Sequence, residues 1–218
     1  MMQIVETEDG SHTIFVPEIS EHYHSIHGAV QESKHIFIRH GFDSSGADPL
    51  NILEIGFGTG LNALLTALRS IESGRKAFYT SVEKYPLDEA TINSLNYSKI
   101  VGQDGSRLFA KIHSSPWDTE TLICNNFIIN KIRGDITKLE LSGSYDIIYF
   151  DAFSPEKQPE LWTDKIFRMI SDVTVKNGFF VTYCVKGLVK RILRSSGFRV
   201  SLVPGPPGKR HIMKAIKI

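Results

Sequence analysis

The sequence predicts an α/β protein with a seven-stranded, mostly parallel sheet whose last strand runs antiparallel. From about residue 50 onward, short β-branched runs alternate with amphipathic segments of helical length, which is the pattern of repeated βαβ units. The runs DIIYF and GFFVTYC are almost continuously apolar, as expected for strands that helices cover on both faces. Right-handed crossovers then produce a doubly wound sheet.

Predicted strands alternate with predicted helices along the chain. Strands are expected at residues 51–57, 77–83, 126–134, 145–152, 178–184, 198–204 and 211–218. Helices are expected at residues 61–73, 87–95, 159–173 and 186–197. The connection between the last two strands, GPPGKR, is too short for a crossover helix, so the last strand must return antiparallel beside its neighbour.

A single domain over residues 1–218 is expected, because no repeat, low-complexity tract or long linker divides the chain. Residues 1–45 are expected to form a small N-terminal addition. It consists of a strand pair, QIVET and HTIFV, and a helix from about Ile26 to Arg39. We expect this addition to cover one end of the sheet.

Composition excludes several classes of protein. The chain is 41% hydrophobic and 22% charged, which is typical of a globular protein and not of a disordered, collagen-like or coiled-coil chain. No apolar stretch approaches the roughly 20 residues of a membrane helix, and the N-terminus has no signal-peptide pattern. Two cysteines, Cys124 and Cys184, cannot build a disulfide framework. We therefore expect a soluble, cytoplasmic protein with no membrane partner, monomeric by default.

Positive charge is concentrated at the C-terminal end. Residues 173–218 contain ten of the 25 basic residues and none of the 24 acidic residues. A solvated helix face explains a single run of like charge. A bias that extends through several elements also favours an anionic partner such as RNA, attracted by a local positive field.

A glycine-rich segment, EIGFGTG from Glu54 to Gly60, follows one predicted strand and opens a helix. Glycines let the backbone turn tightly and approach a ligand closely. Leu61 stands where the third glycine of the dinucleotide fingerprint belongs. Glu54 is poorly suited to a pyrophosphate but suits the positive amino and sulfonium groups of S-adenosylmethionine. A plain strand-to-helix turn is the competing interpretation.

Two further acids follow predicted strands. Glu83 can accept hydrogen bonds from both ribose hydroxyls, or it is an exposed residue at a strand end. Asp135 can accept from the adenine amino group while Ile136 packs on the ring. A helix N-cap competes with this role for Asp135, because aspartate is favoured at such positions.

Asp151 is the candidate catalytic residue. It ends the fourth predicted strand and is followed by Ala152, Phe153, Ser154 and Pro155. Ligands of open α/β sheets bind beyond the carboxyl ends of the strands, so Asp151 is expected to orient an incoming amine, with proton acceptance as a second role. Phe153 can stack a base. A turn aspartate closing a strand is the alternative.

The sequence shows no motif for a nucleophilic serine or cysteine and no motif for a metal site. The sequence has no GxSxG motif and no CxxC motif. The His-rich segment with His22, His24 and His27 has no carboxylate or cysteine partner at metal-ligand spacing. No metal is therefore expected, and these histidines are interpreted as surface or lid residues.

Five motifs together resemble the methyltransferase domain of bacterial tRNA 5-methylaminomethyl-2-thiouridine biosynthesis proteins. They are EIGFGTGLN (54–62), SVEKYPL (81–87), GDITKL (134–139), DAFSPEKQPELWT (151–163) and GPPGKRHIM (205–213). The segment YHSIHGAVQESKHIF (23–37) is similar to the start of that domain. The resemblance implies the Rossmann-like seven-stranded sheet of class I S-adenosylmethionine-dependent methyltransferases. It also implies N-methylation of the 5-aminomethyl group on the tRNA wobble (2-thio)uridine, giving 5-methylaminomethyl-(2-thio)uridine.

The resemblance also implies which residues bind the cofactor and the substrate. The implied cofactor-binding residues are Glu54, Gly56, Phe57, Gly58, Gly60, Asn62, Glu83, Lys84, Asp135, Ile136 and Asp151. The implied substrate-binding residues are Phe153, Pro155, Lys209 and Arg210. Lys209 and Arg210 would contact phosphates of the tRNA anticodon stem-loop, and Glu32 would belong to a lid over the site.

The chain departs from the bifunctional members of that family, which continue into a flavin-dependent oxidase domain. Because this sequence stops at Ile218, no FAD is expected, and the free amine must come from another protein. Two other functions compete with the tRNA methyltransferase. They are a small-molecule amine methyltransferase and an RNA-binding module with a vestigial cofactor site.

Overall fold

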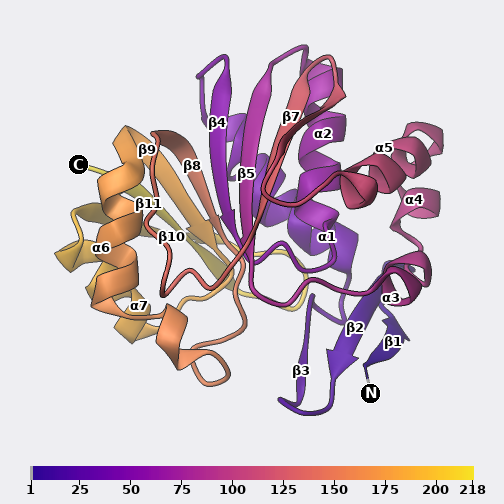
Figure 1. Cartoon of the computed structure of the whole chain (residues 1–218). Helices are drawn as coiled ribbons and strands as arrows, with labels where there is room; N and C mark the ends of the chain where they lie inside the picture. The colour runs from indigo at the N-terminus through magenta and orange to yellow at the C-terminus, as the bar shows by residue number, and fades with distance from the viewer. Residues whose placement is uncertain (1) are drawn as a thin grey trace.

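The structure, a computed structural model, describes residues 2–218 and contains within them an eight-stranded sheet in the order β10-β11-β9-β8-β4-β5-β7-β6 (Figure 1). The strands are β4 (Leu50–Ile55), β5 (Ala77–Glu83), β6 (Glu120–Cys124), β7 (Phe127–Arg133), β8 (Tyr145–Phe150), β9 (Thr174–Thr182), β10 (Phe198–Pro204) and β11 (His211–Lys217). The parallel pairing of β7, β5, β4, β8 and β9 confirms the predicted fold class. The last strand, β11, runs antiparallel between β10 and β9, as predicted.

The sheet has one strand more than the seven predicted. The additional strand, β6, pairs antiparallel with β7 at the sheet edge. Its sequence, ETLIC, has only one buried residue, Ile123, so no apolar run marks it. Two further elements, α4 (Tyr97–Ile100) and α5 (Gln103–Ser114), were also not predicted.

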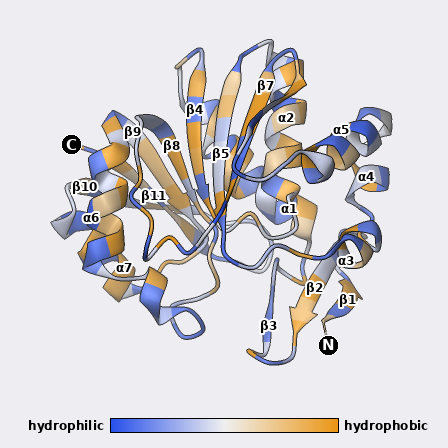
Figure 2. Ribbon diagram, in the orientation of Figure 1, coloured by the Kyte–Doolittle hydropathy of each residue, from blue (hydrophilic) through white to orange (hydrophobic). Residues whose placement is uncertain are grey.

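Helices cover both faces of the sheet (Figure 1). On one face, α2 (Leu61–Ser73) and α5 contribute to one buried cluster, and on the other, α6 (Asp164–Val173) and α7 (Gly187–Ser195) contribute to a second. Figure 2 shows the apolar residues concentrated along the central strands between these helices.

Two predicted helices are shorter in the structure. The helix expected at 87–95 is reduced to α3 (Glu89–Asn93). The helix expected at 159–173 is divided into a 3-10 turn, η3 (Pro159–Leu161), and α6. The Thr163 side chain accepts a hydrogen bond from the Ile166 N–H, so it caps α6 and fixes its start.

The N-terminal addition contains a strand pair, and a third short strand joins it. The strands are β1 (Gln3–Glu6), β2 (His12–Val16) and β3 (Glu21–His22). They lie beside the lower ends of β4 and β5 in the view of Figure 1. The expected helix from Ile26 to Arg39 instead starts as α1 (Ala29–Ser33) and continues as a π-helix, η1 (Lys34–Arg39).

The β-hairpin explains why α1 starts at Ala29. The hydroxyl of Ser11 accepts hydrogen bonds from the N–H groups of Ala29 and Val30, at 3.1 and 3.2 Å. Asp9 accepts from the N–H of Gln31 at 2.9 Å. These bonds satisfy N–H groups that the first turn of a helix leaves unpaired.

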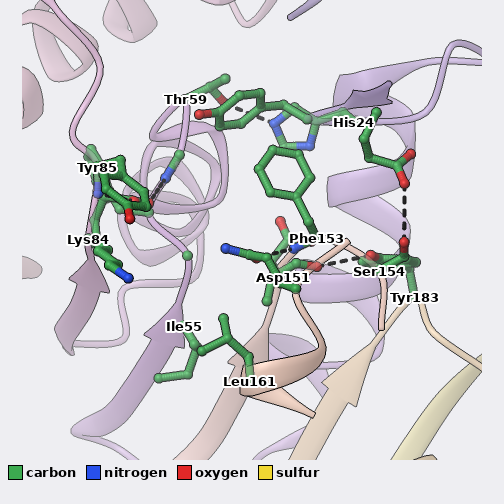
Figure 3. A pocket seen from close by; sticks show the side chains of 18 of the residues that line it. His24, Ile55, Thr59, Lys84, Tyr85, Asp151, Phe153, Ser154, Leu161 and Tyr183 are labelled. Atoms are coloured by element: carbon green, nitrogen blue, oxygen red, sulfur yellow. Dashed lines mark hydrogen bonds between the residues drawn. The ribbon is translucent and has the colours of Figure 1, made fainter. Parts of the chain in front are cut away.

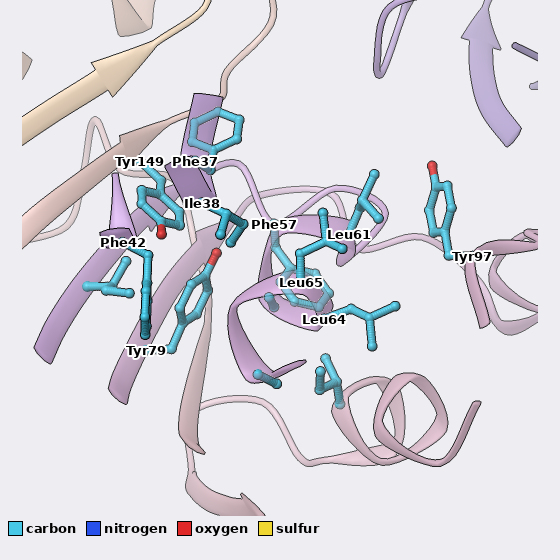
Figure 4. Close-up of a cluster of buried hydrophobic side chains, with 14 of the residues drawn as sticks. Phe37, Ile38, Phe42, Phe57, Leu61, Leu64, Leu65, Tyr79, Tyr97 and Tyr149 are labelled. Atoms are coloured by element: carbon cyan, nitrogen blue, oxygen red, sulfur yellow. The ribbon is translucent and has the colours of Figure 1, made fainter. Parts of the chain in front are cut away.

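Aromatic packing joins this addition to the main sheet (Figure 4). The ring centroids of Phe37, from η1, and Tyr149, from β8, are 5.1 Å apart. Tyr149 in turn lies 6.0 Å from Tyr79 of β5. The addition is therefore held against a buried part of the sheet.

Substitution of a core aromatic residue tests the packing of α6 on the sheet. Phe167 of α6 is fully buried and contacts Phe150 and Phe180, with centroid distances of 5.2 and 5.5 Å. We expect Phe167→Ala to lower the free energy of unfolding by about 3–5 kcal/mol. Leu122→Ala is the control, because Leu122 is 54% exposed, and it should cost under about 1 kcal/mol. Urea denaturation measures both, and equal losses would contradict the assignment of Phe167 to the core.

Candidate active site

A pocket opens at the carboxyl edge of the sheet, between the main sheet and the N-terminal addition (Figure 3). Four strand ends contribute lining residues at 55–59, 82–85, 134–136 and 151–154. The fifth contribution, residues 21–26, comes from the addition. The structure therefore brings together the ends of the segments in which the sequence analysis found its candidate acids.

The glycines of the first loop are required by the backbone and by its neighbours. Gly56 has a φ of +92°, and a Cβ there would lie 2.8 Å from the carbonyl oxygen of Asp151. Gly60 has a φ of +72°, and a Cβ there would lie 2.7 Å from Nε2 of His113. Side chains at these positions would separate the loop from the elements that hold it.

Glu83 holds two loops of the pocket together. One carboxylate oxygen accepts from the N–H of Gly58 at 3.0 Å, and the other accepts from the N–H of Tyr85 at 2.8 Å. Each oxygen retains a lone pair for a ligand. Glu83 is half-buried, lines the pocket and holds its loops, which favours the predicted ligand contact over an exposed residue without a role.

Asp135 lines the pocket and does not cap a helix. Its Oδ1 accepts from the hydroxyl and N–H of Thr137, and its Oδ2 lies 3.0 Å from Nζ of Lys84. The hydrogen bond from Thr137, followed by that from Lys84, lowers the pKa of Asp135 to about 2. No helix follows in residues 136–141, so the N-cap interpretation is wrong. Ile136, beside it, is buried and lines the pocket.

Asp151 is joined to a buried acid behind the pocket. One amide group, Nδ2 of Asn62, donates to Oδ2 of Asp151 at 2.8 Å and to Oε1 of Glu54 at 3.1 Å. Ser81 donates to the other oxygen of Glu54 at 2.6 Å. Burial raises the pKa of Glu54 to about 8 and that of Asp151 to about 7. Asp151 lines the pocket, whereas Glu54 and Asn62 support it from behind.

Not all of the other predicted site residues face the pocket. Phe57 is among the lining residues, but its ring is turned into the core between His113 and Trp117. Phe153 lines the pocket, with its ring edge-to-face on Tyr23 at 5.0 Å. The remaining residues assigned by resemblance divide into two groups. Lys84 and Lys209 line the pocket, while Gly60, Pro155 and Arg210 lie outside its lining.

Among the lining residues that were not predicted as site residues, two form hydrogen bonds that shape the pocket. His24, interpreted from the sequence as a surface or lid histidine, is buried and bonds through Nε2 to the hydroxyl of Thr59 at 2.8 Å. Tyr183 follows β9 and donates to the carbonyl of Ala152 at 2.9 Å. The one sequence signal for Tyr183 as a lining residue was its position at the end of an apolar strand, because the strand ends of this fold face the ligand.

The donors and acceptors of the pocket fit S-adenosylmethionine. Glu83 offers acceptors for hydroxyl groups, Asp135 an acceptor for an amino group beside the apolar Ile136, and Asp151 a negative charge. A nucleoside that carries a sulfonium has hydroxyl groups, an amino group and a positive charge that these three features can bind. Over residues 2–218, no three His, Cys, Asp or Glu side chains lie close enough to hold a metal ion. No helix in the same range is long and apolar enough to cross a membrane.

Comparison with known families identifies the chain. Residues 108–218 match the model of a family described as S-adenosyl-L-methionine-dependent methyltransferase. The chain belongs to this methyltransferase family. The match covers the strands that provide Asp135, Asp151 and Tyr183, whereas the glycine-rich loop and Glu83 lie before the matched region.

Several proteins with sequences similar to this methyltransferase share one name. They are tRNA 5-methylaminomethyl-2-thiouridine biosynthesis bifunctional proteins MnmC. The protein from Methylobacillus flagellatus is 29% identical over 204 residues, and that from Burkholderia thailandensis is 31% identical over 228 residues. These alignments cover 88% and 96% of this chain but only 32% and 34% of the relatives. The chain thus spans about a third of the length of these relatives.

A solved structure is also similar. The crystal structure of MNMC2 from Aquifex aeolicus superposes with a TM-score of 0.80 at 25% sequence identity. The superposition covers 100% of the methyltransferase chain and 70% of the Aquifex chain. The likeness therefore includes the N-terminal addition as well as the sheet.

Removal of Glu83 should weaken binding of the methyl donor. We expect Glu83→Ala to lower the affinity of the methyltransferase for S-adenosylmethionine by about 10- to 100-fold, because hydrogen bonds to a charged group contribute about 1.5–3 kcal/mol. Isothermal titration calorimetry measures this affinity. Glu89→Ala, an exposed residue of α3, is the matched control and should change it by about twofold at most. Equal affinities of the two variants would remove Glu83 from the cofactor site.

The buried His24 should make stability depend on pH. Burial lowers the pKa of His24 to about 4, against about 6.5 in an unfolded chain. As the pH falls through this window, the unfolded chain binds a proton that the folded protein does not, so stability falls. We expect His24→Gln to reduce the slope of unfolding free energy against pH by up to about 1.4 kcal/mol per unit. Urea unfolding at several pH values tests this, with His211→Gln as control. An unchanged slope in His24→Gln would contradict it.

Proposed function

We propose that this methyltransferase N-methylates the 5-aminomethyl group of the tRNA wobble (2-thio)uridine, giving 5-methylaminomethyl-(2-thio)uridine. The observation that carries the proposal is Asp151, a largely buried carboxylate that lines the pocket together with an aromatic residue, Phe153. The names of the similar MnmC proteins support the choice of substrate. The cytoplasm is the proposed compartment, where tRNA is modified.

The proposed cofactor contacts follow the three acids. Glu83 accepts from the ribose hydroxyls, and Asp135 accepts from the adenine amino group while Ile136 packs on the ring. The loop with Gly56 and Gly58 lets the backbone approach the cofactor closely. S-adenosylmethionine supplies an electrophilic methyl group on a positively charged sulfur. No FAD and no metal are required for this transfer.

Asp151 is proposed to orient the amine and to accept its proton. An alkylammonium ion has a pKa near that of lysine, about 10.4, and it has no lone pair until it loses a proton. The ionised Asp151 carboxylate attracts the ammonium and lies where a proton can be transferred to Oδ1, since Oδ2 is held by Asn62. A carboxylate whose pKa lies near 7 accepts a proton more readily than an ordinary one.

Basic residues near the pocket are proposed to bind the phosphates of the tRNA anticodon stem-loop. Lys209 and Arg210 occupy the turn between β10 and β11. Arg191 and Arg194 are exposed on α7, which begins shortly after Tyr183 at the pocket wall. Because phosphate contacts release counterions, binding of tRNA should weaken steeply with salt.

A direct assay tests the proposed reaction. The protein is incubated with labelled S-adenosylmethionine and tRNA that carries 5-aminomethyluridine at the wobble position, and the nucleosides are analysed by mass spectrometry. We expect one labelled methyl group on the 5-aminomethyl nitrogen. The same tRNA with an unmodified wobble uridine is the control and should remain unlabelled. Label in both tRNAs, or in neither, would reject the proposed function.

The pH dependence of this reaction tests the role of Asp151. Burial, followed by the negative charge of Glu32, raises the pKa of Asp151 to about 7, so the fraction of carboxylate increases as the pH rises from 6 to 8. We expect kcat/KM of the wild type to rise over that range. Asp151→Asn should lower kcat by about 100-fold or more and abolish the rise. A rise of unchanged size in Asp151→Asn would assign it to another group.

A further inference from the structure

A lysine of the C-terminal hairpin reaches into the pocket and forms an ion pair there. Nζ of Lys209 lies 3.1 Å from Oε1 of Glu32, and 5.4 Å from the centroid of the Tyr183 ring. The side chains of Lys209 and Glu32 are 28% and 10% exposed. All three residues line the pocket, and they come from the β10–β11 turn, α1 and the end of β9.

Glu32 presents one oxygen to the pocket in a fixed position. Its Oε2 accepts from the backbone N–H of Ser25 at 2.8 Å, which leaves Oε1 for the cation. The capping of α1 by Ser11 holds the backbone that carries Glu32. The charges of Glu32 and Lys209 both act on the pKa of Asp151, which Glu32 raises and Lys209 lowers. The ion pair therefore lies near Asp151, in the same pocket.

The group that Glu32 binds has the same chemistry as the proposed substrate. The head of a lysine side chain is a primary ammonium on a methylene group, and so is a protonated 5-aminomethyl group. A buried carboxylate and an aromatic ring face are the two features that stabilise such a cation. In this structure Lys209 supplies the cation from within the chain.

We propose that Glu32 and Tyr183 form the binding site of the acceptor amine, and that Lys209 occupies this site until the substrate amine replaces it. The inference rests on the proposed function, because it takes the acceptor to be a primary amine on RNA. When RNA binds, Lys209 leaves Glu32 for a phosphate and the substrate ammonium takes its place. Glu32 is thus a positioning and specificity residue, beside the reacting carboxylate of Asp151.

The surrounding structure allows Lys209 to move without unfolding. Lys209 lies in a turn closed by a hydrogen bond from the N–H of Gly205 to the carbonyl of Arg210, at 3.1 Å. The backbone of the turn can therefore stay in place while the long lysine side chain rotates. A largely buried carboxylate left without a cation is costly. An RNA with an uncharged wobble uridine would leave Glu32 unpaired, whereas an aminomethyl group restores the pair.

Binding measurements separate this role from a structural one. The probes are two anticodon stem-loops, with 5-aminomethyluridine or with unmodified uridine at the wobble position, and the protein is saturated with S-adenosylhomocysteine. We expect the wild type to bind the aminomethyl stem-loop about 10-fold or more tightly. In Glu32→Gln this preference should fall to about twofold or less, because an uncharged amide attracts an ammonium only weakly. Glu32→Asp, which keeps the charge, should retain part of the preference.

A substitution of Lys209 gives a second test, in which KM should change in opposite directions for two substrates. In Lys209→Gln the internal competitor is lost, so KM for the free nucleoside 5-aminomethyluridine should fall severalfold. The KM for the aminomethyl stem-loop should rise, because a phosphate contact is lost. Lys176→Gln, an exposed residue at the start of β9, is the matched control and should change neither value. If Glu32→Gln fails to fold, as shown by circular dichroism, this second test decides alone.

The outcomes also separate this inference from the proposed function. A full preference retained in Glu32→Gln, or a raised KM for the nucleoside in Lys209→Gln, would show that the ion pair is only structural. Either result can occur while the wild type methylates the aminomethyl stem-loop normally, and then only the amine site is rejected. If the wild type methylates neither the stem-loop nor the nucleoside, the proposed function itself fails.

Discussion

The parallel pairing of four strands, β7, β5, β4 and β8, is the constraint on which the site depends. Strands that run in one direction all end at the same edge of the sheet, so the loops that follow them must meet there. Glu83, Asp135 and Asp151 lie far apart in the sequence, and this geometry alone collects them around one pocket. Hydrogen bonds from the loops to Glu83 then fix the shape of that pocket.

Different surroundings give these acids different pKa values. Asp135 is held ionised by Thr137 and Lys84, whereas the pKa of Asp151 rises because protein surrounds it. Asn62 fixes the orientation of Asp151 and joins it to Glu54, which belongs to the core and not to the lining. The glycine-loop motif therefore includes two residues, Glu54 and Asn62, that act through Asp151 and support the acid from behind.

Much of the fold could be predicted from the sequence because apolar periodicity reports burial directly. The antiparallel end of the sheet followed from the short connection GPPGKR. Strand β6 could not be predicted, since it lies at an edge and is mostly exposed. In the candidate site, the strand-end acids were predictable from their positions after apolar runs. His24 and the Glu32–Lys209 pair were not, because their partners lie 35 and 177 residues away, and no local pattern records such distances.

The attachment of the N-terminal hairpin has a consequence for the order in which the chain acquires its structure. The backbone N–H of His12 donates to the side chain of Asn96, which in turn donates to the carbonyl of Gly10. During synthesis the hairpin leaves the ribosome long before Asn96 does, and at about 5–20 residues per second the delay lasts several seconds. The N-terminal addition must therefore consolidate late, after the strands and helices between the hairpin and Asn96 have been synthesised.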